Sequence, residues 1–198
     1  MKGYAFDRAS VLLVDDSVWM RAVLRQMLKA LGFTRVTEAD SGVAALNKLE
    51  ALQPDVILTD WDMQPLNGLD LTRRIRRLPG QERFTPIIMI SAYSRLSNVL
   101  AARNAGVSEF LVKPLSPQAL YHRLAAVIER PRPFIEAPNY IGPDRRRQGA
   151  EGYLGRKRRQ SDQGPVADGG RRLPDVPLTQ EDISDIMSCT RTPQEVCG

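Results

Sequence analysis

Within its first 130 residues the chain alternates short apolar runs with longer segments of helical periodicity. A short apolar run has the length of a buried strand, whereas apolar residues spaced three and four apart form one face of a helix. The predicted strands lie at 10–15, 34–39, 56–60, 86–91 and 109–112, and the predicted helices at 18–31, 42–52, 68–78, 94–105 and 117–129. Strands that alternate with helices form parallel sheets covered on both faces, so the pattern predicts an α/β fold.

The last 68 residues differ in composition from the rest. Residues 131–198 hold 8 of the 14 prolines and 8 of the 14 glycines, which together make up about a quarter of that segment. Such a proportion approaches that of disordered chains. We therefore expect one folded unit up to about residue 130, a disordered Pro/Gly/Arg-rich tail over 131–177, and a disordered end over 189–198.

Charge, hydropathy and cysteine content narrow the class further. A net charge of +5 is too small to indicate nucleic-acid binding. The helix over 68–78 carries four arginines, Arg76 among them, and we expect them mostly on its outer side. No apolar run approaches the roughly 18 residues of a membrane-spanning helix, so we expect no membrane insertion. Cys189 and Cys197 both lie in the tail and cannot cross-link the folded unit, which favours a reducing, cytoplasmic location.

Polar residues follow the predicted strands at the edge where parallel sheets bind ligands. Asp15 and Asp16 follow the first strand, Asp60 and Asp62 the third, Ser91 the fourth, and Lys113 with Pro114 the fifth. Crowded carboxylates repel each other, and Mg²⁺, which prefers a few carboxylates plus water and phosphate oxygens, would relieve that repulsion. A carboxylate can also attack a phosphoryl group, and Asp60, on a central strand opposite the acidic pair, is the best candidate.

At these residues the chain resembles the receiver domains of bacterial two-component systems, most of all the chemotaxis CheY type. The matching stretches are VLLVDDSVWMRAVLRQMLKALGF, EADSGVAALNKL, DVILTDWDMQPLNGLDL, IIMISA and EFLVKP. Their order and spacing cover residues 8–130 almost without gaps. The resemblance implies a flavodoxin-like (βα)5 fold, a doubly wound parallel sheet with strand order 2-1-3-4-5.

The resemblance also implies roles for the strand-end residues. It makes Asp60 the phosphoacceptor and implies a Mg²⁺ site formed by Asp15, Asp16, Asp60 and the backbone carbonyl of Asp62. Ser91 becomes the switch hydroxyl, Phe110 the switch aromatic and Lys113 the phosphate contact, with a cis peptide between Lys113 and Pro114. Asp62 and Tyr93 occupy the two positions that tune phosphoryl lifetime.

Two positions depart from the pattern of the family. Phe110 stands where a tyrosine is more usual, so the switch aromatic has no hydroxyl to donate. The family usually has a proline four residues after the acceptor, but here that position is Gln64 and the proline follows as Pro65. We therefore expect a reshaped loop.

These observations predict a stand-alone response regulator rather than an enzyme with turnover. A histidine kinase or phosphotransfer protein would phosphorylate Asp60, and the face formed by the fourth helix, fifth strand and fifth helix would then bind an output protein, in chemotaxis or a phosphorelay. Two alternatives remain open. The segment 140–160, with seven basic and two acidic residues, could bind nucleic acid, and Asp60-Trp61-Asp62 matches the DxD pattern of aspartate-nucleophile phosphatases.

The segment 178–188 reads as a short amphipathic helix. Ile183, Ile186 and Met187 share one face, and Leu178 precedes them as a hydrophobic staple. A helix this short is marginal alone, so its helicity should depend on docking. The stretch resembles the LSQxEIDxLL segment of the flagellar switch protein that binds phosphorylated CheY-type receivers. We expect it to dock on its own receiver or on another copy, under the control of phosphorylation.

Overall fold

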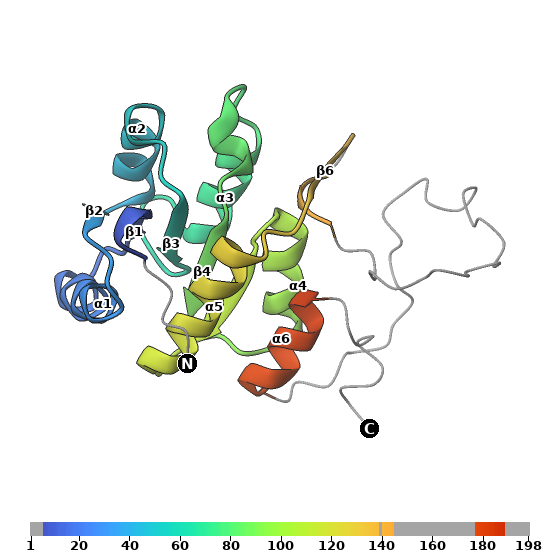
Figure 1. The fold of residues 1–198 in the computed structure, drawn as a ribbon. Helices are drawn as coiled ribbons and strands as arrows, with labels where there is room; N and C mark the ends of the chain where they lie inside the picture. Colours follow the sequence, from blue (N-terminus) through green and yellow to red (C-terminus); the bar gives the residue numbers. More distant parts are fainter. Residues whose placement is uncertain (1–5, 139, 145–176, 189–198) are drawn as a thin grey trace, which may run out of the picture.

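The computed structural model describes residues 6–138, 140–144 and 177–188. A five-stranded parallel sheet forms the centre of the molecule, with helices on both faces (Figure 1). Its strands, in spatial order, are β2 (Arg35–Ala39), β1 (Ser10–Val14), β3 (Val56–Asp60), β4 (Ile87–Ser91) and β5 (Glu109–Val112). The predicted α/β fold with strand order 2-1-3-4-5 is confirmed.

Each strand is followed by a helix, as the periodicity predicted. The five helices are α1 (Val18–Ala30), α2 (Gly42–Leu52), α3 (Gly68–Arg76), α4 (Leu96–Ala105) and α5 (Pro117–Glu129), and two 3-10 turns are η1 (Phe6–Arg8) and η2 (Gln81–Phe84). Side chains of Ser17, Ser41, Asn67 and Ser116 accept hydrogen bonds from backbone amides at the starts of α1, α2, α3 and α5. Polar caps of this kind satisfy amides that have no partner inside the helix.

The core divides into layers because neighbouring residues of a strand point to opposite faces of the sheet. Leu13 packs in the layer that includes Leu24 of α1 and Leu124 of α5. Leu12, its neighbour on β1, packs in the opposite layer with Leu71 of α3. The near-continuous apolar strands are therefore buried on both faces, and their carboxyl ends remain the place where polar side chains gather.

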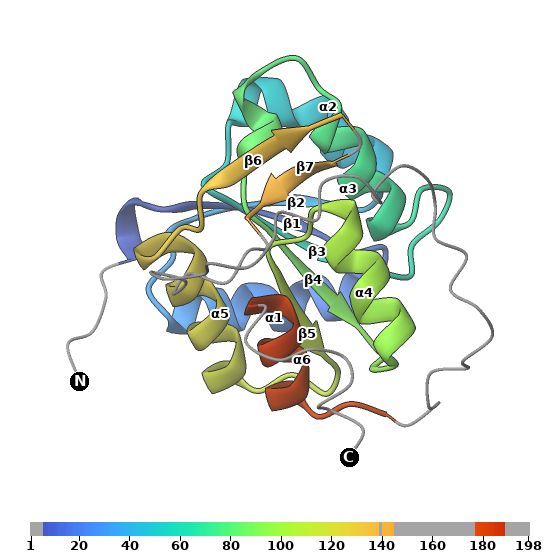
Figure 2. The same ribbon diagram turned by 90° about the vertical axis from the view of Figure 1, so that its right-hand side faces the viewer.

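Residues 131–138 and 140–144 correct the expectation of a disordered tail. A two-stranded antiparallel hairpin, β6 (Phe134–Ala137) and β7 (Tyr140–Pro143), lies beside α3 and α4 (Figure 2). Phe134 packs edge-on against Phe84, with ring centroids 5.9 Å apart. The segments 145–176 and 189–198, including most of the basic repeat, lie outside the described residues.

The position of Arg76 was also predicted wrongly. Its side chain is buried rather than outside, and its guanidinium lies 4.9 Å from the ring of Phe134. The guanidinium donates to the carbonyls of Gly106, Arg83 and Thr85 at 2.6–3.1 Å. The arginine thus links α3, η2 and the turn after α4, and the hairpin covers it.

The C-terminal helix α6 (Gln180–Ser188) packs against α4 and β5. In Figure 2 it lies over β5, between α4 and α5. The predicted amphipathic helix therefore forms and docks on its own receiver. Among the described residues, no helix combines the length and the apolar composition needed to span a membrane.

Candidate functional site

The carboxyl ends of four neighbouring strands bring the predicted site residues to one edge of the sheet. The parallel register pairs Val14 with Thr59, and Asp60 with Ile90. Ser91 in turn lies level with Val112. Residues that directly follow or end these strands therefore share one edge of the sheet, which is where doubly wound folds bind ligands.

Asp60 and Lys113 form an ion pair at this edge. Lys113 Nζ lies 2.7 Å from Asp60 Oδ1, and the backbone amide of Asp62 donates to Asp60 Oδ2 at 3.0 Å. Asp60 is 6% exposed. The cation of Lys113 therefore orients one oxygen of a mostly buried carboxylate. The peptide bond between Lys113 and Pro114 is cis, and so is that between Gln64 and Pro65.

The start of α3 approaches the backbone of Asp60 closely. The amide of Gly68 donates to the carbonyl of Trp61 at 2.9 Å. A Cβ at position 68 would lie only 2.1 Å from the Asp60 carbonyl oxygen, so glycine is required for this approach. The loop between Asp60 and α3 is thereby closed tightly around the end of β3.

Asp15 lies buried beside Asp60, whereas Asp16 is exposed. One oxygen of Asp15 accepts from the amide of Ser17 at 2.8 Å, and its Oδ2 has no hydrogen-bond partner among the described residues. Burial raises the pKa of Asp15, and the charges of Asp60 and Asp16 add to the rise, while the Ser17 amide and Lys113 oppose it. A buried carboxylate oxygen without a partner is a poor structural element and a suitable cation ligand.

The residues present fit Mg²⁺ better than a metal that needs a protein cage. In the described part of the chain, no three His, Cys, Asp or Glu side chains converge closely enough to hold a metal by themselves. Mg²⁺ retains several waters and needs only one or two carboxylates, which matches the free oxygen of Asp15 and the neighbouring Asp60.

Ser91, Tyr93 and Asp62 form a short chain of contacts at the same edge of the sheet. The hydroxyl of Ser91, which is 1% exposed, accepts from the amide of Tyr93 at 2.9 Å. The hydroxyl of Tyr93 donates to Asp62 Oδ2 at 3.3 Å. The two positions expected to tune phosphoryl lifetime therefore contact each other, and Asp62 points toward Tyr93 with its side chain.

Phe110 is fully buried beneath the site. Trp61, which follows Asp60 in the chain, packs edge-on against Phe110 and Tyr93 with ring centroids 6.3 Å apart in both cases. Sequence reasoning assigned no role to Trp61. Its signal was its position, since the residue after a strand-end acid must point away from the pocket that the acid enters.

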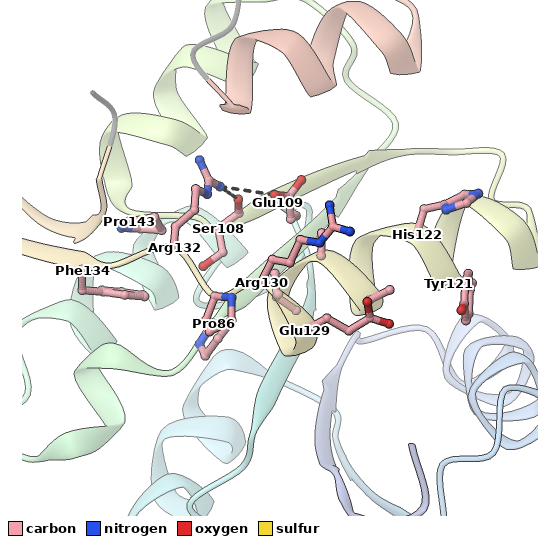
Figure 3. Close-up of a pocket in the computed structure, with 14 residues that line it drawn as sticks. Pro86, Ser108, Glu109, Tyr121, His122, Glu129, Arg130, Arg132, Phe134 and Pro143 are labelled. Atoms are coloured by element: carbon pink, nitrogen blue, oxygen red, sulfur yellow. Dashed lines mark hydrogen bonds and ion pairs between the residues drawn. The ribbon is translucent and has the colours of Figure 1, made fainter. Parts of the chain in front are cut away.

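A separate cavity of about 450 Å³ opens near the amino ends of β4 and β5 (Figure 3). It lies between α5, the start of β5 and the hairpin, and its lining includes Pro86, Tyr121 and Phe134. Arg132 donates to the carbonyl of Ser108 and lies 3.3 Å from Glu109 in its wall. None of the predicted site residues borders this cavity.

Comparisons with known proteins agree with this geometry. The family model described as response regulator receiver domain matches residues 11–125. Chemotaxis protein CheY1 of Helicobacter pylori is 41% identical over 121 residues, which are 60% of this chain and 95% of that protein. Chemotaxis protein CheY of Pseudomonas aeruginosa is 36% identical over 122 residues, which are 61% of this chain and 96% of that protein.

Solved structures show the same similarity. Chemotaxis response regulator CheY4 of Vibrio cholerae has a TM-score of 0.57 and 32% identity, and the match covers 61% of this chain and 98% of that one. A response regulator receiver domain protein from Clostridium thermocellum has a TM-score of 0.56 and 27% identity, with 62% and 95% covered. The hairpin and α6 lie beyond residue 125, where the family match ends.

Proposed function

Because the chain belongs to the response regulator receiver domain family, we propose that it accepts a phosphoryl group on Asp60 and signals by binding another protein. One observation carries the proposal, the cluster of a mostly buried carboxylate, a cation 2.7 Å away and a second buried acid with a free oxygen. A structural ion pair would not need the second acid, since burying another negative charge beside the first is unfavourable.

The donor is a phosphohistidine of a kinase or phosphotransfer protein. An oxygen of Asp60 attacks the phosphorus, so a P–O bond forms as the P–N bond to the donor breaks. Lys113 then balances negative charge on the phosphoryl oxygens. Mg²⁺, held by Asp15, Asp16, Asp60 and the carbonyl of Asp62, would offset the charge of the incoming phosphoryl group.

The output is a population shift rather than substrate turnover. A phosphoryl group on Asp60 offers new acceptors to the hydroxyl of Ser91, whose present partner is the Tyr93 amide. Moving Ser91 inward changes the space available to Phe110. Since Phe110 lies on β5, this change reaches the face of α4, β5 and α5, where an output protein of a chemotaxis or relay pathway binds. We infer that this cycle takes place in the cytoplasm, where a kinase or phosphotransfer protein would meet the receiver.

Phosphorylation with a small acyl phosphate in Mg²⁺ tests the assignment. We expect wild type to form an acid-stable, base-labile phosphoprotein, and Asp60→Asn to form none. Glu50→Gln is the matched control, because Glu50 is an exposed acid on α2 that does not follow a strand. Equal labelling of Asp60→Asn and wild type would refute Asp60 as the acceptor. Turnover of a generic phosphomonoester by wild type would instead favour a phosphatase.

A further inference from the structure

Helix α6 covers a face formed by α4 and β5, with α5 at its rim (Figure 2). Its apolar side chains Ile183, Ile186 and Met187 are at most 1% exposed. They share a cluster with side chains from β4, α4, the turn after α4 and β5, namely Met89, Leu96, Val99, Ala102, Val107 and Phe110. The helix therefore completes the apolar packing of the α4–β5–α5 face.

Gln180, the first residue of α6, pairs with the open edge of the sheet. Its Nε2 donates to the carbonyl of Phe110 at 2.9 Å, and its Oε1 accepts from the amide of Val112 at 3.0 Å. β5 is an edge strand, whose outward backbone groups need partners. A glutamine amide carries the donor and acceptor of a peptide group, so one side chain makes the two bonds that a further strand would make.

The start of α6 is fixed by contacts of its own. The amide of Leu178 donates to the carbonyl of Ser94 at 3.0 Å, which holds the segment beside the start of α4. Thr179 and Asp182 form a reciprocal capping box, with backbone-to-side-chain distances of 3.0 and 3.2 Å. The helix thus begins at a defined place on the receiver.

Two arginines contact the other end of α6. Arg103 donates to the carbonyl of Ile186 at 3.2 Å, and Arg132 donates to the carbonyl of Met187. Arg132 also pairs with the buried Glu109 at 3.3 Å. Cations at the C-terminus of a helix satisfy its last carbonyls and oppose its dipole. The face therefore contacts the C-terminal carbonyls of α6 as well as its apolar side, which fixes the direction of the helix.

The connection between α6 and the rest of the chain is long. Residues 145–176, which lie outside the described residues, number 32. A fully extended chain of this length reaches at most about 110 Å, so α6 can leave the face while it stays attached. Attachment to the same chain raises the local concentration of α6 near the face.

We propose that α6 is an attached ligand that occupies the α4–β5–α5 face and must be displaced by an external partner, itself an amphipathic helix. The partner helix carries an amide side chain in its first turn and apolar side chains three, six and seven residues later, as α6 does at positions 180, 183, 186 and 187. Weak partners then cannot bind the face, whereas partners that outcompete α6 can.

This competition is linked to the proposed function through β5. Gln180 holds the backbone of Phe110 and Val112, and Lys113 follows directly. If phosphorylation of Asp60 moves Phe110, it changes the affinity of the face for α6, and occupancy by α6 changes the free energy of phosphorylation by the same amount. Only this linkage rests on the proposed function; the competition itself does not require phosphorylation.

Competition is measured on the full, unphosphorylated chain with a fluorescein-labelled peptide of residues 177–188. If α6 occupies its face about nine-tenths of the time, freeing the face tightens apparent peptide binding about tenfold. The double variant Ile183→Asp/Ile186→Asp should show this tightening by fluorescence anisotropy up to millimolar peptide. Glu181→Gln is the matched control, since Glu181 is exposed on the same helix, and it should bind as wild type does.

A second readout follows the docked helix directly. The amide of Val112 donates to Gln180, so Gln180→Ala should speed its hydrogen exchange, whereas Glu181→Gln should not. Equal peptide affinity in wild type and the double variant, or unchanged exchange in Gln180→Ala, would overturn the proposal. Both measurements are repeated in Asp60→Asn. This variant should accept no phosphoryl group, but its α6 should compete with the peptide as in wild type. A failure of the proposed phosphorylation can therefore be told apart from a failure of the proposed competition.

Discussion

Replacing Gly68 with alanine tests whether the start of α3 holds Asp60 in position. A Cβ at position 68 would lie 2.1 Å from the carbonyl oxygen of Asp60 and 3.2 Å from Thr59 Oγ1. Real Cβ contacts essentially never fall under 3.0 Å, so the two segments must separate by about 0.9 Å. The nearest atom belongs to backbone, and no rotation of a side chain can relieve the contact.

The expected cost follows from this displacement. Overpacking of this kind costs about 1–3 kcal/mol, while alanine gains up to about 1 kcal/mol over glycine within a helix. We therefore expect Gly68→Ala to lower the free energy of unfolding by about 1–2 kcal/mol. A displacement of about 1 Å at a reacting group can also slow a reaction about 100-fold, so phosphorylation of Asp60 should slow far more than the stability loss suggests.

Urea denaturation and the rate of phosphorylation by a small acyl phosphate measure the two effects. Gly80→Ala is the matched control, because a Cβ there meets only the flexible carboxylate of Glu82 and the backbone has a negative φ. This variant should stay within about 0.5 kcal/mol of wild type and be phosphorylated at the same rate. If Gly68→Ala matched wild type in both measurements, the close approach of α3 would not position Asp60.

Three further perturbations test other parts of the site and its surroundings. Lys113→Met removes the cation beside Asp60, and phosphorylation should slow at least about tenfold; stability measured in urea should fall by more than about 1 kcal/mol because the mostly buried Asp60 loses its counter-charge. Mg²⁺ at about 100 times its dissociation constant should stabilise the chain by about 2.7 kcal/mol, measured in urea against EDTA, and Asp15→Asn should lose this gain. Burial raises the pKa of Glu109 despite Arg132 and Arg123, so the folded chain keeps that proton to higher pH than the unfolded chain. Stability should therefore fall as pH rises above about 4.5, and this slope should flatten in Glu109→Gln.

The fold and the strand-end cluster could be predicted because both depend on local patterns. Each strand is a short apolar run, and parallel strands bring their carboxyl ends to one edge whatever the details of helix packing. The ion pair of Asp60 with Lys113 follows from that geometry alone. The contact between Tyr93 and Asp62 does not, since it depends on how two loops of unlike sequence fold over the edge.

The hairpin and Arg76 could not be predicted from local patterns. An arginine at the end of a helix normally points to solvent, and a Pro-rich segment with few apolar residues normally lacks order. Here the buried guanidinium and the hairpin stabilise each other. The carbonyls of Gly106 and Thr85 satisfy the guanidinium of Arg76, and Phe134 covers it. Since these partners are distant in sequence, composition alone could not reveal the pairing.

The same reasoning makes the folding and the docking of α6 a single transition. Nine residues form a marginal helix in water, because nucleation fixes several residues before the first hydrogen bond forms. The contacts that offset this cost are intersegment ones: the burial of Ile183 and Ile186, and the hydrogen bonds of Gln180 to β5. A change in helix content should therefore accompany displacement of α6 by any partner. A change in the backbone of β5 should therefore alter the folding and the docking of α6 together. When α6 leaves the face, it should also lose its helical structure.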